Sequence, residues 1–181
     1  IATSTNGLSW TDRGYILGQC GLVYFLGKFI TGSYNTIRTS TNGITWIDNG
    51  TFPAGPDYSN SQERIFSVID GVLYLMGTTG VYSTTDLVTW TLELSVLNPK
   101  LLAKIGTGFV LVTKTTIYQG ATVASLAEIA TRNQTTSAVV HQGLVVTTGN
   151  PSGTVFVSTA NTIGIQTAQA VSGGYTYVRI K

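Results

Sequence analysis

The sequence predicts an all-β fold made of repeated four-stranded antiparallel units. Apolar and polar residues alternate with a period of two along most of the chain, β-branched residues are frequent, and helical periodicity is nearly absent. The motif Thr-Ser-Thr-Asn-Gly-x-(Ser/Thr)-Trp occurs at Thr3–Trp10 and again at Thr39–Trp46, and a looser copy occupies Ser83–Trp90. An internal repeat of this kind indicates the architecture before any single residue is interpreted.

The spacing of the repeat predicts a small β-propeller. The motif tryptophans lie 36 and 44 residues apart, and four-stranded units with a period of roughly 40 residues are typical of propeller blades. The chain starts in the second half of a unit, and Tyr175–Lys181 looks like the first strand of another. Joining the two gives five blades with a composite N- and C-terminal closing blade, in a single domain over residues 1–181. The alternative is an open fragment of a longer propeller, and the chain is expected to be a mature or trimmed piece of a longer protein.

Each unit is expected to contain four consecutive strands. The first strands are Tyr15–Gln19, Arg64–Ile69, Leu101–Ile105, Ser137–His141 and Tyr175–Ile180; the second are Leu22–Gly27, Val72–Gly77, Phe109–Thr113 and Leu144–Thr148. The third strands are Thr36–Thr41, Gly80–Thr84, Thr116–Gln119 and Thr154–Thr159; the fourth are Ile44–Asp48, Val88–Leu94, Ser125–Ala130 and Ile163–Ala168. Glycine-containing turns at Gln19–Gly21, Asp70–Gly71, Gly106–Gly108 and Gln142–Gly143 are expected between the first and second strands.

The motif itself is interpreted as a hairpin. Asn-Gly between extended flanks predicts a two-residue type I′ turn, because both residues tolerate positive φ. In the third copy Asp86-Leu87 replaces Asn-Gly, and a different turn is expected there because leucine disfavours positive φ. The preceding hydroxyl residue is expected to bond the turn backbone. The three tryptophans, Trp10, Trp46 and Trp90, are expected to pack between neighbouring blades.

The segments Thr3–Thr11 and Thr39–Asp48 resemble the Asp-box, or bacterial neuraminidase repeat, with Asn-Gly in place of Asp-Gly. The run before each motif is similar to repeats of bacteriophage tail and fibre proteins and of bacterial surface proteins. The resemblance covers the first half of the chain by motif and the second half by strand pattern. It implies propeller blades, in enzymes and in non-enzymatic proteins alike, so it implies fold more than function.

Composition excludes several classes of partner and cofactor. Net charge is +2, charged residues make up 10% of the chain, and the basic residues are scattered, which argues against nucleic-acid binding. No apolar stretch approaches the roughly 18–20 residues that span a membrane. The single cysteine, Cys20, is expected to be a buried, inert thiol and permits neither an internal disulfide nor a thiolate metal site. No cofactor or metal is expected.

Catalytic chemistry is not predicted. Resemblance to a sialidase would imply a site with three arginines, a tyrosine nucleophile with a glutamate partner, and an aspartate. This chain has five arginines, and they are scattered along the sequence. A glycosidase needs two facing carboxylates. Asp57 and Glu63, in or beside the long loop, are the only two carboxylates placed where a catalytic pair could lie. Solvated charges on a loop are the better interpretation of both residues. The lone His141 flanks a turn and is expected to lie on the surface. We therefore expect a non-enzymatic protein.

Binding residues are expected where the repeat is broken. The insertion Phe52–Gln62 and the segment Gly32–Asn35 combine aromatic, amide and carboxylate groups, which suit sugar C–H faces and hydroxyls. An irregular loop without a ligand is the competing interpretation. The candidate ligand residues are Phe52, Asp57, Tyr58, Asn60, Tyr34 and Asn35.

The expected function is a phage tail-fibre or receptor-binding module that recognises a host cell-surface polysaccharide. The expected location is the virion or an extracellular surface, with other virion proteins as possible partners and a trimer as a possible assembly. The alternatives are a structural capsid or tail decoration domain and a bacterial surface lectin.

Overall fold

The computed structural model describes residues 1–15, 20–33, 36–53, 65–131, 135–141, 144–149, 154–159 and 162–166. These residues form four four-stranded antiparallel sheets and one two-stranded hairpin, joined by turns and one short 3-10 segment. The all-β prediction is therefore confirmed. The chain divides into two units, Ile1–Asn98 and Pro99–Lys181, which are described separately below.

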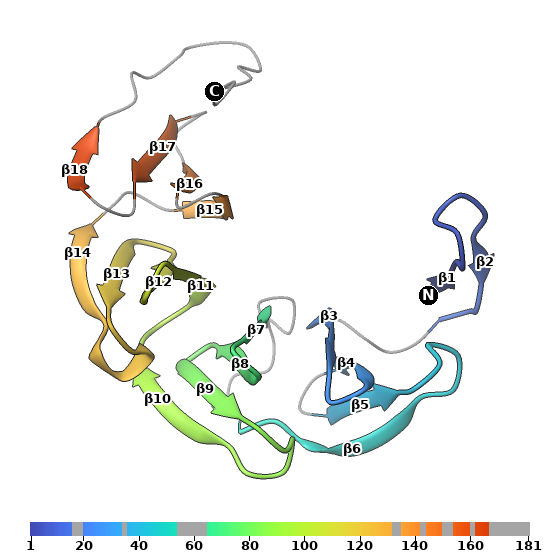
Figure 1. Ribbon diagram of the computed structural model, residues 1–181. Helices are drawn as coiled ribbons and strands as arrows, with labels where there is room; N and C mark the ends of the chain where they lie inside the picture. The colour runs from blue at the N-terminus through green and yellow to red at the C-terminus, as the bar shows by residue number, and fades with distance from the viewer. Residues whose placement is uncertain are drawn as a thin grey trace. The chain divides into compact units, whose positions relative to one another are not determined.

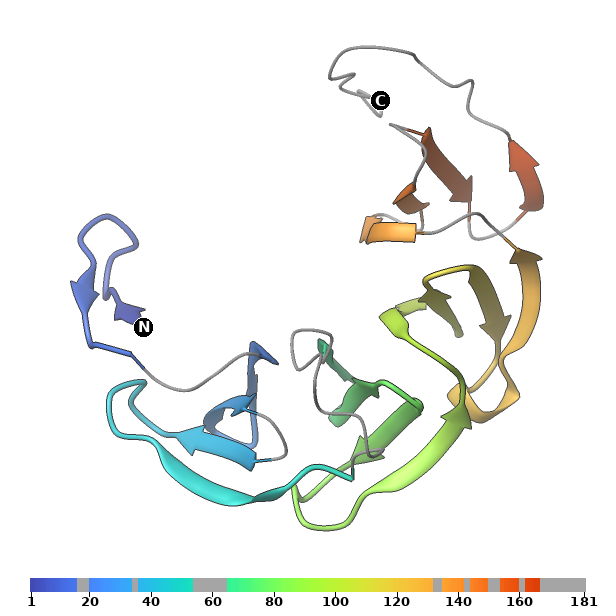
Figure 2. The ribbon, with the colours of Figure 1, turned by 180° about the vertical axis from the view of Figure 1, so that it is seen from behind.

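The first unit holds the hairpin and two of the sheets (Figures 1 and 2). Each four-stranded sheet is a meander in which every strand pairs with the next strand in the chain. The hairpin is β1 (Ala2–Thr3) and β2 (Thr11–Asp12); the first sheet is β3 (Cys20–Phe25), β4 (Lys28–Ser33), β5 (Thr36–Ser40) and β6 (Ile47–Thr51); the second is β7 (Ile65–Ile69), β8 (Val72–Gly77), β9 (Gly80–Thr84) and β10 (Thr91–Ser95).

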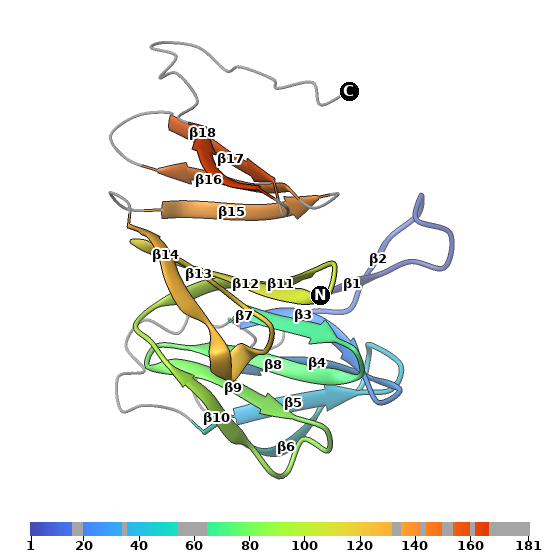
Figure 3. The same cartoon turned by 60° about the vertical axis from the view of Figure 1, so that its left-hand side comes forward.

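The second unit holds two further meanders, whose strands run side by side within each sheet (Figure 3). Their strands agree with the pattern predicted for the second half of the chain, where no motif tryptophan is present. One sheet is β11 (Pro99–Ile105), β12 (Gly108–Thr113), β13 (Thr116–Gly120) and β14 (Ala127–Thr131), with η2 (Val123–Ser125) before β14; the other is β15 (Thr135–His141), β16 (Leu144–Gly149), β17 (Thr154–Thr159) and β18 (Thr162–Gln166).

The first turn of the first sheet lies later in the chain than predicted. Phe25 pairs with Lys28, so the two-residue turn is Leu26-Gly27, with φ of 49° and 73°. Asp70-Gly71 makes the equivalent turn in the next sheet, with φ of 51° and 75°. Two positive φ values are what a type I′ turn requires.

The predicted turn at Gln19–Gly21 is wrong, because β3 runs through Cys20 and Gly21. Leu22–Phe25 therefore lies in the first strand of its sheet, not the second, and the second strand, Lys28–Ser33, was missed. The error arose because leucine disfavours positive φ, so Leu26-Gly27 did not look like a turn. Tyr15 lies outside any strand, and the rest of the predicted strand Tyr15–Gln19, like Tyr175–Lys181, lies outside the described residues.

A core cluster joins the two sheets of the first unit. It consists of side chains from β3, β4 and β5, from β8, and from the segments that follow β6 and β9. Each fully buried aliphatic side chain in it contributes about 1.5–3 kcal/mol of hydrophobic stabilisation. The cluster is Phe25, Ile30, Ile37, Phe52, Leu73, Leu75 and Leu87, with Val23, Phe66, Tyr82 and Trp90 packed against it.

Candidate functional site

The motif hairpins are held by side-chain oxygens that accept backbone hydrogen bonds. In the second copy the Ser40 hydroxyl accepts from the N–H groups of Asn42 and Gly43 at 3.3 and 2.8 Å. The Asn42 side chain then accepts from Ile44 and Thr45 at 2.8 and 2.9 Å. The predicted bonding by the preceding hydroxyl is therefore confirmed.

The predicted type I′ turn is wrong. Asn42 is not among the described residues with positive φ, and Gly43 alone has one, at 71°. Thr39 pairs with Ile47, so the loop is longer than two residues and the fourth strand starts later than predicted. Asparagine is needed here as an acceptor for two N–H groups rather than for its tolerance of positive φ.

The third hairpin keeps the same geometry despite its different sequence. Asp86 accepts from Val88 and Thr89 at 2.8 and 2.7 Å, and Thr84 accepts from Leu87 at 2.9 Å. Leu87 adopts a φ of 67°, so the expectation of a different turn is also wrong. The Leu87 side chain is only 4% exposed and belongs to the core cluster, and this burial offsets the backbone strain.

A fourth copy, which sequence reasoning missed, precedes β14. Thr122 takes the place of the asparagine and accepts from the N–H of Ser125 at 3.2 Å. Gln119 pairs with Ala127 as Ser83 pairs with Thr91, so Leu126 takes the place of Trp90. The separation of 36 residues from Trp90, equal to that between the first two tryptophans, was the available signal.

The three motif tryptophans differ in burial. Trp90 packs against the core cluster, and Trp46 is partly buried and donates to the Gly43 carbonyl at 3.3 Å. Trp10 makes the same bond to Gly7 but is 64% exposed, so the packing prediction is wrong for this residue within the described structure. The buried Trp90 Nε1 has no partner among the described residues.

Asp86 gives the third hairpin a pH dependence. Hydrogen bonds from the Thr89 and Val88 backbone lower the pKa of Asp86 from its ordinary value of 3.8. The stabilisation is therefore present above pH 3.8 and is lost as the pH falls below it. We expect Asp86→Asn, which copies the acceptor of Asn42, to match the wild type near neutral pH and to be less sensitive to acid. The urea midpoints of both proteins, measured from pH 2 to 7, test this. Midpoints that fall equally with decreasing pH in the wild type and in Asp86→Asn would contradict it.

The connector between β6 and β7 is a long segment of the first unit. It spans thirteen residues, 52–64, whereas three residues separate β10 from β11 and three separate β14 from β15. The predicted insertion therefore lies between two sheets. The candidate residues Asp57, Tyr58, Asn60, Tyr34 and Asn35, together with Glu63, lie outside the described residues and stay predictions.

Phe52 is a core residue rather than a surface contact. Its ring is 4% exposed and lies 5.7 Å from Phe66 and 6.0 Å from Trp90, measured between ring centroids. A methyl group added at Gly32 would collide with it. The structure therefore corrects the assignment of Phe52 to a ligand-binding role: it anchors the start of the connector between two sheets.

Arg38, Asp48 and Glu93 have partners on neighbouring strands. Arg38 and Asp48 make an ion pair at 2.9 Å across β5 and β6, and the Ser83 hydroxyl donates to Glu93 at 2.6 Å. Burial raises the pKa of Tyr74, and the nearby Glu93 and Asp70 carboxylates raise it further. A raised pKa keeps the phenol protonated, which opposes use as a nucleophile. The part of the chain that the structure describes holds no group of three or more His, Cys, Asp or Glu side chains suited to a metal ion.

No α-helix in the described part of the chain has the length and apolar character to cross a membrane. A search of family models finds no match for the chain, and a search of curated proteins finds none either.

Several solved structures are similar in fold. The computationally designed Ika8 protein has a TM-score of 0.58 and 14% identity, over 88% of this chain and 52% of that chain. The designed Ika4 protein has a TM-score of 0.52 and 15% identity, over 81% of this chain and 98% of that one. The N-terminal domain of Nup159 has a TM-score of 0.50 and 14% identity, over 77% and 40%. The chain thus spans about half the length of the Ika8 chain and less of the Nup159 chain. These likenesses show the fold alone, and the successive four-stranded sheets fit a β-propeller.

Proposed function

We propose that the chain is a non-enzymatic recognition module of a virion, in a tail fibre or receptor-binding protein, and that it binds a host cell-surface glycan. The observation that carries this proposal is the connector at residues 52–64, the long interruption between two otherwise regular sheets. Recognition residues concentrate on loops that a rigid scaffold positions. The buried Phe52 fixes the first residue of this connector to the core cluster.

The repeat supports the same class of protein. In four hairpins a side-chain oxygen accepts a hydrogen bond from the N–H three residues on, and the first two hairpins carry the Asp-box-like sequence that resembles phage tail and fibre repeats. We propose that the fold is a five-bladed propeller whose closing blade combines the two ends of the chain. The scaffold then presents the connector, and Asp57, Tyr58, Asn60, Tyr34 and Asn35 are the proposed sugar contacts.

A glycan array with the purified chain tests the function. We expect binding to at least one bacterial envelope polysaccharide, without release of sugar fragments, and a several-fold loss of affinity in Tyr58→Ala. Tyr15→Ala is the matched control, because Tyr15 is an exposed tyrosine outside the connector. Absence of binding to every envelope glycan would overturn the proposal. Equal loss in both variants would move the site away from the connector.

A structural decoration domain is the second candidate, and one observation favours it. Leu8, Ile44 and Val88 occupy the same position in three hairpins, and all three are exposed, Leu8 by 87%. Apolar groups repeated at one exposed position suit contact with another protein. Replacing all three by serine leaves glycan binding intact under the first proposal and abolishes assembly with the neighbouring virion protein under the second.

A further inference from the structure

Three Asn-Gly sequences lie in the first unit, at Asn6, Asn42 and Asn49. An asparagine that precedes glycine can lose its side-chain nitrogen as ammonia without an enzyme. Glycine has no side chain to keep its backbone nitrogen away from the asparagine side-chain carbon. The reaction requires both groups to leave their hydrogen-bonded positions, so the structure around each pair decides which asparagine is modified.

Asn6 and Asn42 form a matched pair with the same local chemistry. Both stand in the sequence Thr-Asn-Gly, and the N–H of each following glycine donates to the motif serine at 2.8 Å. The asparagine oxygen accepts from the N–H three residues on at 3.0 Å in the first hairpin and at 2.9 Å in the second. Local hydrogen bonds therefore hold the two sites equally.

The surroundings of the two glycines differ. Gly43 is buried, and a methyl group on it would meet Thr3 at 3.5 Å and Phe29 at 3.9 Å. Gly7 is exposed, and a methyl group on it would meet nothing within 4 Å among the described residues. The backbone nitrogen that attacks the side chain is therefore open to water and base in the first hairpin and covered in the second.

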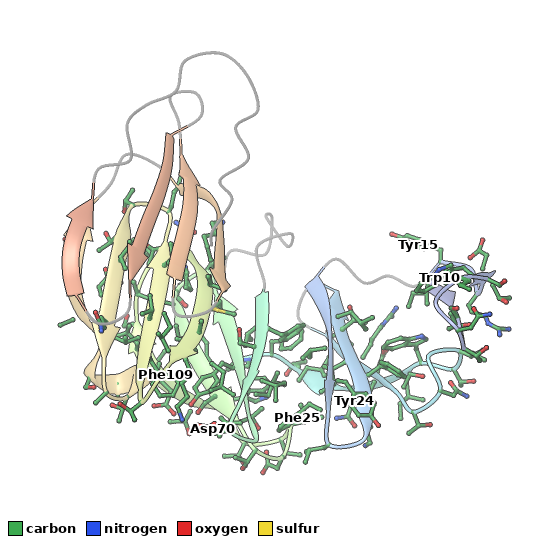
Figure 4. All side chains as sticks on the ribbon, turned by 45° about the horizontal axis from the view of Figure 1, so that its top comes forward. Trp10, Tyr15, Tyr24, Phe25, Asp70 and Phe109 are labelled. Carbon is green, nitrogen blue, oxygen red and sulfur yellow. The ribbon has the colours of Figure 1, made fainter. Side chains whose placement is uncertain are left out.

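The first hairpin is also held by less structure. β1 and β2 have two residues each in the described part of the chain, whereas β5 and β6 belong to a four-stranded sheet with a buried core. Figure 4 shows Trp10 on this hairpin, and its side chain is 64% exposed. A two-stranded hairpin is marginally stable by itself, so its hydrogen bonds open more often than those of the sheet.

The third pair, Asn49-Gly50, lies within β6 at a register shift in its pairing with β5. Asn49 is half-buried, and residues paired with β5 stand on both sides of it, at Asp48 and Thr51. Ring closure there requires this stretch of β6 to separate from β5, so Asn49 is expected to react more slowly than Asn6.

We propose that Asn6 is a site of spontaneous modification in the folded protein, where deamidation precedes any reaction at Asn42 or Asn49. The Gly7 nitrogen attacks Cγ of Asn6 and forms a new N–C bond. The side-chain nitrogen leaves as ammonia and takes the proton of the Gly7 N–H. Water then opens the five-membered imide: addition at Cγ gives aspartate, and addition at the backbone carbonyl carbon gives isoaspartate.

The two products have opposite effects on the hairpin. Aspartate keeps the acceptor, as Asp86 shows by accepting from Val88 and Thr89 at 2.8 and 2.7 Å in the third hairpin. Isoaspartate adds a methylene group to the backbone and displaces the carboxylate, so the N–H groups of Leu8 and Ser9 lose their acceptor. Either product lowers the net charge of the chain by one, from +2 to +1.

Peptide mapping of the incubated full chain by mass spectrometry tests the proposal. Trypsin cleavage after Arg13 and Arg38 separates Asn6 from the other two sites, which fragment masses then distinguish. At mildly alkaline pH we expect Asn6 to deamidate at least about tenfold faster than Asn42 in the folded chain. In urea the two sites are expected to react at the same rate, because their Thr-Asn-Gly sequences are identical.

Three outcomes would overturn the proposal. Asn42 or Asn49 could react as fast as Asn6 in the folded chain. Asn6 could stay unmodified in the folded chain while the unfolded chain reacts. The difference between Asn6 and Asn42 could persist in urea, which would assign it to sequence rather than to structure.

A pair of variants tests the cause of the protection at Asn42. Phe29→Ala removes the ring that covers Gly43 and is expected to raise the rate at Asn42 several-fold without changing the rate at Asn6. Phe109→Ala is the matched control, because Phe109 holds the equivalent second position of β12. Far-ultraviolet circular dichroism checks that both variants are folded. Equal rates at Asn42 in the two variants would show that burial of Gly43 does not protect this site, and would overturn the argument from burial.

Discussion

Phe52→Ala is expected to lower the free energy of unfolding by about 3–5 kcal/mol, the range measured for buried phenylalanine truncations. The Phe52 ring packs against the rings of Phe66, in the second sheet, and Trp90, just before β10, and Gly32 of the first sheet leaves room for it. Its removal leaves a cavity that the flanking strands are too constrained to fill. Urea denaturation followed by tryptophan fluorescence measures the loss. An unchanged slope of unfolding free energy against urea concentration shows that the unfolded state is not altered.

Two controls separate this structural role from a ligand-binding one. Tyr15→Ala, at an exposed aromatic residue, is expected to change stability by less than about 0.5 kcal/mol. Phe52→Leu keeps most of the apolar volume and is expected to recover more than half of the lost stability. If Phe52→Ala leaves stability unchanged and abolishes glycan binding, the core assignment is wrong and the original ligand assignment is restored.

The second half of the chain shows what periodicity can predict without motifs. The strands of β11 to β18 agree with the predicted pattern, because alternating apolar residues specify extended segments whatever the hairpin sequence. Turn types were less predictable, since they depend on single φ values. Leu26 and Leu87 both adopt positive φ, and nothing local in the sequence favours that.

The position of the long connector was predictable from the sequence, whereas the role of Phe52 was not. A break in the repeat at residues 52–62 correctly located the long connector between β6 and β7. The sequence did not separate Phe52 from its neighbours, because an aromatic residue next to a polar loop is equally consistent with a ligand contact and a core anchor. Burial against Phe66 and Trp90, residues 14 and 38 positions away, resolves that choice, and contacts at such separations appear only once the sheets are packed.

Leu87→Gly is expected to destabilise the protein although it restores the residue found in the first two motifs. Glycine removes backbone strain of about 1–2 kcal/mol at a φ of 67°. It also removes a side chain that is almost fully buried in the core cluster, and leucine truncations at such sites cost about 2–5 kcal/mol. Burial therefore outweighs strain, and we expect a net loss of about 1–3 kcal/mol.

Leu87→Ala separates the two effects, because alanine loses most of the burial and keeps the strain. The expected order of stability is wild type, then Leu87→Gly, then Leu87→Ala, with the glycine variant about 1 kcal/mol above the alanine variant. Urea midpoints of the three proteins measured side by side at neutral pH provide the comparison. A glycine variant as stable as the wild type would show that the core closes around the missing side chain. An alanine variant above the glycine variant would show that the backbone at residue 87 is not strained.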